Sequence, residues 1–176
     1  MERDQLAARI SYQDLSEGTH EIERLKVRAQ LMNHPSATLG YRIESGGHAI
    51  CYLSDHEPYF EDVWRKDAQP GRLDSVREAG DRRHAAFMQD ADIVIHEAQY
   101  TPEEYLGKRH WGHTSYTYVV ELAAAAGVRR LFLTHHDPSH DDAFRSDVEK
   151  RAQKLAKQLN SPLEVSCAYE SCEINL

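Results

Sequence analysis

The chain has 176 residues, which is enough for one domain with a sizeable hydrophobic core. Apolar residues make up 40% and charged residues 28%, as in ordinary globular domains, and the net charge of −8 argues against a general surface for polyanions. No apolar run approaches the roughly 20 residues that span a membrane, and the charged N-terminus lacks the apolar segment of a signal peptide. Cys51, Cys167 and Cys172 are odd in number and irregularly spaced, so we expect reduced thiols in a cytoplasmic protein.

The first half of the chain predicts strands. Residues 1–20 are polar with weak periodicity and are expected to form a connector, which leaves residues 21–176 as the domain. Alternating or apolar stretches then predict three consecutive strands, with a turn at Gly46-Gly47 between the last two: residues 25–33, 38–44 and 48–54. Residues 56–80 are loop-like, with one short helix expected near residues 59–66.

Helices and strands alternate in the second half. Helical spacing predicts helices over residues 81–91, 114–127 and 141–160, the second opening at Thr114 or Ser115 and closing at Gly127. Strands are expected over residues 92–97, 128–134, 163–169 and 172–176. Three strands followed by this alternation predict an α/β layered domain with a mixed sheet.

Isolated acids and histidines lie just after the predicted strands. They are His34, Asp55, Glu97 and His135, and His113 comes just before a predicted helix. A lone loop histidine is more often solvated or a helix cap than a ligand, but the repetition of this placement favours a metal site along one edge of the sheet. A helix N-terminus also attracts anions, so His113 could face an anionic substrate.

Five segments in order carry a resemblance: NHPSATLGYRI, SDHEP, IHEA, GHTS and LTHHDP. Together they resemble the C-terminal half of the metallo-β-lactamase-fold phosphodiesterases, ribonuclease Z-like branch, over roughly residues 20–140. SDHEP departs from ribonuclease Z proper and is more similar to the broader bacterial members of the superfamily.

The resemblance implies half of an αββα sandwich, with helices on one face of a mixed sheet. It implies a metal-dependent phosphodiesterase that uses a metal-bridging hydroxide and two divalent ions, zinc in the first place with manganese or iron as alternatives. His34 would bind the first metal and His135 the second, with Asp55 shared between them. His113, oriented by Glu97 through a hydrogen bond, would be the catalytic group.

Several alternatives stay open. His136 could replace His135 as the ligand, and His56 and Glu57 could line the site or belong to a solvated loop. No HxHxDH cluster occurs in the sequence, so neither metal would reach the usual four ligands from this chain. Three interpretations follow: half of a hydrolase that needs an N-terminal partner, a chain that pairs with its own copy through an apolar sheet face, or a non-catalytic binding module. The substrate-binding residues and the phosphodiester itself remain unidentified.

Overall fold

The computed structural model describes residues 12–60 and 62–175. Its strands form one sheet in which spatial order follows chain order. The strands are β1 (Gly18–Ile22), β2 (Leu25–Leu31), β3 (Leu39–Ser45), β4 (His48–Leu53), β5 (Ile93–Glu97), β6 (Arg130–Thr134) and β7 (Glu164–Cys167). Neighbours from β1 to β4 are antiparallel and those from β4 to β7 are parallel, which confirms the predicted mixed sheet.

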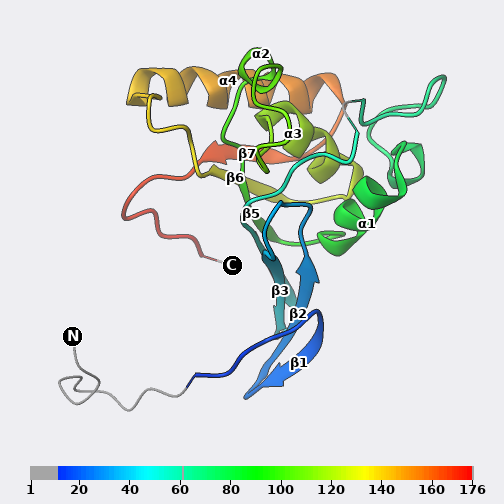
Figure 1. Ribbon diagram of the computed structural model, residues 1–176, viewed down its shortest axis with the longest axis vertical. Coiled ribbons are helices and arrows are strands. Elements are labelled where there is room, and N and C mark those ends of the chain that lie inside the picture. Colours follow the sequence, from blue (N-terminus) through cyan, green and yellow to red (C-terminus); the bar gives the residue numbers. More distant parts are fainter. Residues whose placement is uncertain (1–11, 61, 176) are drawn as a thin grey trace.

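The helices gather on one side of the sheet. They are α1 (Ala79–Phe87), α2 (Pro102–Tyr105), α3 (Tyr116–Ala125) and α4 (Asp142–Gln158), with a short 3-10 helix η2 (Leu73–Ser75). Figure 1 shows α3 and α4 together on one side of strands β5, β6 and β7. The carboxylate of Asp141 accepts the N–H of Phe144 and so caps α4, which stabilises the end of this helix. The expected placement of helices on one face is confirmed.

Strand alternation divides the sheet into two unequal faces. The face toward the helices carries fully buried side chains from the central strands, namely Cys51, Leu53, Val94, Leu131 and Leu133. On the opposite face, the register places Tyr41, Tyr52, Ile95 and Phe132 side by side across four strands. Tyr52 keeps 47% of its surface exposed, so this row is apolar yet incompletely covered.

Four local expectations differ from the structure. The helix expected near residues 59–66 is wrong for the described part, because Trp64 bridges to Val76 and donates its indole N–H to Glu121 instead. Strand β1 begins inside the segment expected to be a connector, and residues 172–175 form no strand. The unpredicted α2 is nucleated by a capping box between Thr101 and Glu104.

All three cysteines are free thiols. Among the described residues, no helix combines the length and the apolarity that a membrane crossing requires.

Candidate metal centre

The sheet brings the ends of several strands to one edge. Strands β4, β5 and β6 are parallel, so their carboxyl ends lie together. Asp55 lies just after β4, Glu97 ends β5 and His135 directly follows β6. Strand β2 runs in the same direction as β4 because β3 is antiparallel to both, and this delivers His34 to the same edge.

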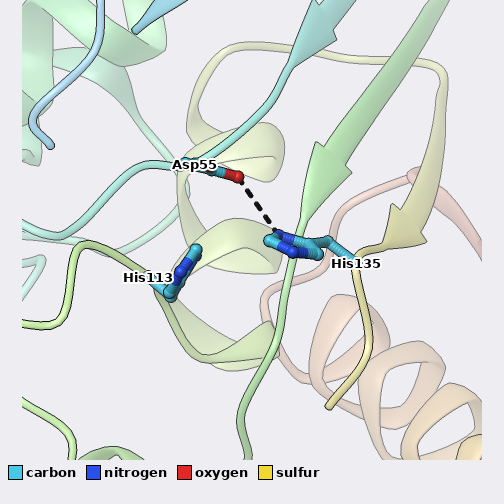
Figure 2. A group of neighbouring side chains, drawn as sticks. All are labelled: Asp55, His113 and His135. Atoms are coloured by element: carbon cyan, nitrogen blue, oxygen red, sulfur yellow. Dashed lines mark ion pairs between the residues drawn. The ribbon is translucent and has the colours of Figure 1, made fainter. Parts of the chain in front are cut away.

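Asp55 lies at the centre of the resulting cluster. Asp55, His113 and His135 each offer one ligand atom, and these atoms lie within 4.8 Å of one another (Figure 2). One oxygen of Asp55 is 3.2 Å from Nδ1 of His135, and the other is 3.9 Å from Nε2 of His34. Carboxylate oxygen and imidazole nitrogen are donors that zinc and its neighbours in the first transition row accept. The donor set therefore fits a divalent metal, with each Asp55 oxygen facing a different histidine.

The two adjacent histidines after β6 point to different places. His135 has a left-handed backbone with φ of 54°, which turns its exposed side chain toward Asp55. The side chain of His136 is half-buried, and its Nε2 is buried with no hydrogen-bond partner among the residues that the structure describes. Burial, reinforced by the charge of Arg145, lowers the pKa of His136. Of this pair, His135 is the one placed as a ligand.

His34 is held by its own loop and by a glycine. Its Nδ1 lies 2.9 Å from the hydroxyl of Ser36 and 3.1 Å from that of Thr38, which leaves Nε2 directed at Asp55. Gly112 presses on the other edge of the ring, since a Cβ there would lie 2.7 Å from Nε2 of His34. Ligand histidines in proteins are commonly oriented through the second ring nitrogen in this manner.

The hydrogen bond expected between Glu97 and His113 is not formed in the described part of the chain. The Glu97 carboxylate accepts backbone N–H groups of His56 at 3.2 Å and Gln99 at 3.1 Å, and that of Thr114 as well. Complete burial raises the pKa of Glu97 well above its ordinary value, against the lowering effect of these N–H groups. In the described part of the chain these backbone N–H groups, and not the His113 ring, occupy the Glu97 carboxylate. The catalytic role assigned to Glu97 stays a prediction.

His113 lies among imidazoles, and its ligand atom is within 4.8 Å of that of Asp55. Its ring centroid lies 4.9 Å from that of His135 and 5.8 Å from that of His34. Desolvation, followed by the charges of neighbouring histidines, lowers its pKa, where pairing with Glu97 would have favoured the protonated form. The geometry groups His113 with Asp55 and His135, so it could act as a ligand as well as a catalytic group.

A buried histidine network adjoins the centre through His56, the residue after Asp55, and no sequence pattern predicted it. His56, His84 and His96 are all at most 1% exposed, and the rings of His56 and His84 stack at 3.7 Å. Nε2 of His84 lies 2.8 Å from Nε2 of His96, and His56 contacts the hydroxyl of Tyr118 at 3.1 Å. His96, on β5, is packed in the core with none of its surface exposed.

A cleft of about 710 Å³ opens beside His34. Its walls include Glu57, Tyr59, Tyr105 and His110. Glu57, for which a solvated loop was an alternative, is only 8% exposed, so that alternative is wrong.

Comparisons with known proteins agree with this architecture. The profile described as "Beta-lactamase superfamily domain" matches residues 15–136. A ribonuclease Z of Lactiplantibacillus plantarum is 26% identical over 168 residues, which cover 80% of this chain and 54% of that protein. The chain thus spans about half the length of this curated relative.

Two solved structures share the fold. The metallo-β-lactamase fold protein YhfI from Bacillus subtilis superposes with a TM-score of 0.57 and 19% identity, covering 85% of this chain and 49% of that one. The short form of human tRNase Z gives a TM-score of 0.56 and 20% identity, covering 89% and 45% respectively.

Proposed function

Because the chain belongs to the β-lactamase superfamily, we propose that it supplies metal ligands to a hydrolase that cleaves phosphodiesters. The convergence of Asp55, His113 and His135, with ligand atoms within 4.8 Å of one another, is the observation that carries this proposal. The similarity to a ribonuclease Z supports a phosphodiester as the substrate class.

The side chains of this chain have separable roles in the proposal. Asp55, His34 and His135 would hold divalent ions, zinc in the first place, since one oxygen of Asp55 faces each of these histidines. Bound ions of this kind polarise a phosphoryl oxygen and lower the pKa of a water molecule. His113 hydrogen-bonds the substrate oxygens and passes a proton to the leaving oxygen, which is typically worth about 10²–10⁴-fold in rate.

The donors in this cluster are too few for two four-coordinate metals. We therefore propose that a polypeptide carrying HxHxDH completes the centre. It would pack its own sheet on the row formed by Tyr41, Tyr52, Ile95 and Phe132, because that face is apolar and Tyr52 is 47% exposed.

Zinc titration and turnover test this function separately. Calorimetric titration of the metal-free chain with Zn²⁺ should show binding that Asp55→Asn weakens at least about tenfold, since an amide lacks the charge that holds a cation. Asp74→Asn, at an exposed surface site, is the matched control and should leave the affinity unchanged. Failure of the chain to bind Zn²⁺ would refute the metal centre and favour the non-catalytic binding module.

Hydrolysis of bis(p-nitrophenyl) phosphate tests whether the chain needs a second polypeptide to complete its metal centre. With Zn²⁺ or Mn²⁺ the chain alone should show little hydrolysis, and a polypeptide containing HxHxDH should start it. Robust turnover by a chain of verified length would contradict the need for a partner.

A further inference from the structure

Glu57 collects hydrogen bonds from the loop that leads to His113. Its Oε1 accepts the phenol O–H of Tyr105 at 3.2 Å and the backbone N–H of His110. Its Oε2 accepts the backbone N–H of Gly112 at 3.0 Å. One carboxylate therefore fastens the loop at three points, the last of them one residue before His113.

The backbone of Glu57 is itself fixed to the loop of His34. Its N–H donates to the carbonyl of Asn33 at 2.8 Å, and its own carbonyl accepts the side-chain amide of Asn33 at 2.8 Å. The backbone N–H of Asn33 donates in turn to Nδ1 of His56 at 3.2 Å. Glu57 is thus immobilised between the residue before His34 and the residues after Asp55.

Through Gly112, Glu57 affects the positions of both His34 and His113. The bond from Gly112 to Glu57 holds Gly112 against the His34 ring, where even a methyl group would clash. It also sets the direction in which the chain continues into His113. The Glu57 carboxylate is only 8% exposed, and among the described residues the phenol of Tyr105 and the N–H groups of His110 and Gly112 donate to it.

We infer that Glu57 is a positioning residue for the metal centre: by tethering residues 105–112 it fixes the spacing of His113 from His34 and Asp55. This inference rests on the proposed function, since the spacing matters only where His113 acts beside metal ions held by His34 and Asp55. Outer groups that orient ligands typically change metal affinity or activity by about 10–100-fold when replaced.

Glu57→Gln is the direct test. The amide keeps the size of the side chain, but its NH₂ group would face an N–H donor at Gly112 or His110. In metal-free protein, amide hydrogen exchange over residues 106–113 should accelerate at least about tenfold, because a bond that protects this loop is lost. Zn²⁺ affinity should fall about 10–100-fold, and the absorption bands of the Co²⁺-substituted protein should shift as the coordination geometry changes.

Glu121→Gln is the matched control. Glu121 is another largely buried carboxylate, on α3, and it accepts the indole N–H of Trp64 outside the centre. Its replacement should leave Zn²⁺ affinity, the Co²⁺ spectrum and exchange over residues 106–113 as in the wild type. If Glu57→Gln does not fold, Glu57→Asp keeps the charge but is too short to reach all three donors, and it should produce the same changes.

The outcomes separate the two proposals. Unchanged exchange in residues 106–113, or an unchanged Co²⁺ spectrum with only lower stability, would overturn the positioning role. Absence of Zn²⁺ binding by the wild-type chain would refute the proposed function, and the exchange measurement would still decide whether Glu57 fixes the loop.

Discussion

Gly112 lies where the loop before α3 passes over the His34 ring, with a backbone φ of 91°. An added Cβ would lie 2.7 Å from Nε2 of His34 and 2.8 Å from Cδ of Pro35. Gly112→Ala should therefore lower the free energy of unfolding by about 1–3 kcal/mol and weaken Zn²⁺ binding. Urea unfolding with chelator and calorimetric titration measure the two effects.

Gly107→Ala is the control for that substitution. A Cβ at this position would meet only the carbonyl oxygen of Glu104, at 3.8 Å. Its stability and metal affinity should stay close to the wild type. Equal behaviour of the two alanine variants would contradict the tight contact at His34.

His135 and His136 differ in a way that mutation can resolve. His135 faces Asp55 at 3.2 Å, whereas Nε2 of His136 is buried and has no hydrogen-bond partner within residues 12–60 and 62–175. His135→Ala should reduce Zn²⁺ affinity at least about tenfold with little change in stability. His136→Ala should change stability and leave the Zn²⁺ affinity nearly intact. If calorimetry instead shows that His136→Ala weakens Zn²⁺ binding and His135→Ala does not, His136 is the ligand.

The candidate ligands were predicted from their positions after strands. The hydrogen bond predicted between Glu97 and His113 was wrong. Strand ends could be read from apolar runs, which is why His34, Asp55 and His135 were found. The partners of Glu97 could not be predicted from the sequence, because they are backbone N–H groups, those of His56 and Thr114 among them. Every residue except proline carries such a group, so the sequence does not distinguish these two. Such competition becomes visible only when the loops are placed in space.

At the scale of elements, strands with strong periodicity were predicted well and aromatic loops were not. The stretch around Tyr59 and Trp64 has the residues of a short helix, but its aromatic groups are used for tertiary contacts. The Tyr59 ring fills the space over Gly80, and Trp64 reaches Glu121 on α3. Tertiary packing overrides local propensity here.

The histidine network joins α1 to β5 and makes stability depend on pH. Burial lowers the pKa of His96 from 6.5 to about 4 and that of His84 well below 6.5. Below pH 6.5 the unfolded chain therefore binds protons that the folded chain does not, and the free energy of unfolding should fall as pH drops from about 6.5 toward 4. Each histidine contributes up to about 1.4 kcal/mol per pH unit within that window.

Urea unfolding of metal-free protein between pH 8 and pH 4.5 measures this dependence. His84→Leu should have a shallower slope below pH 6.5, because one group that titrates only on unfolding has been removed. Between pH 7 and 8 the variant and the wild type should show parallel dependence. An identical slope in both proteins at low pH would show that His84 is not kept neutral by the fold.

At the scale of the whole molecule, the uncovered sheet face should govern association. Tyr52→Lys places a charge in the middle of the apolar row and should weaken binding of the HxHxDH polypeptide at least about tenfold, because that charge would be buried at the interface. Gln158→Lys, on an exposed part of α4, is the control and should bind normally. Light scattering of the chain alone reports self-association, and a monodisperse monomer with no affinity for such a polypeptide would contradict the role of this face.

The order of strands in the sheet has a consequence for how the molecule is made. Because β1 to β7 lie side by side in the order of the chain, no strand has to insert between two that are already paired. Each new strand can join the open edge left by the one before it as the polypeptide leaves the ribosome. Contacts between sequence neighbours are also the ones that form fastest, since the chain loses less entropy in closing short loops. In this order the metal-site edge would be completed when β6 delivers His135 to strands that already present His34 and Asp55, before β7 joins the sheet.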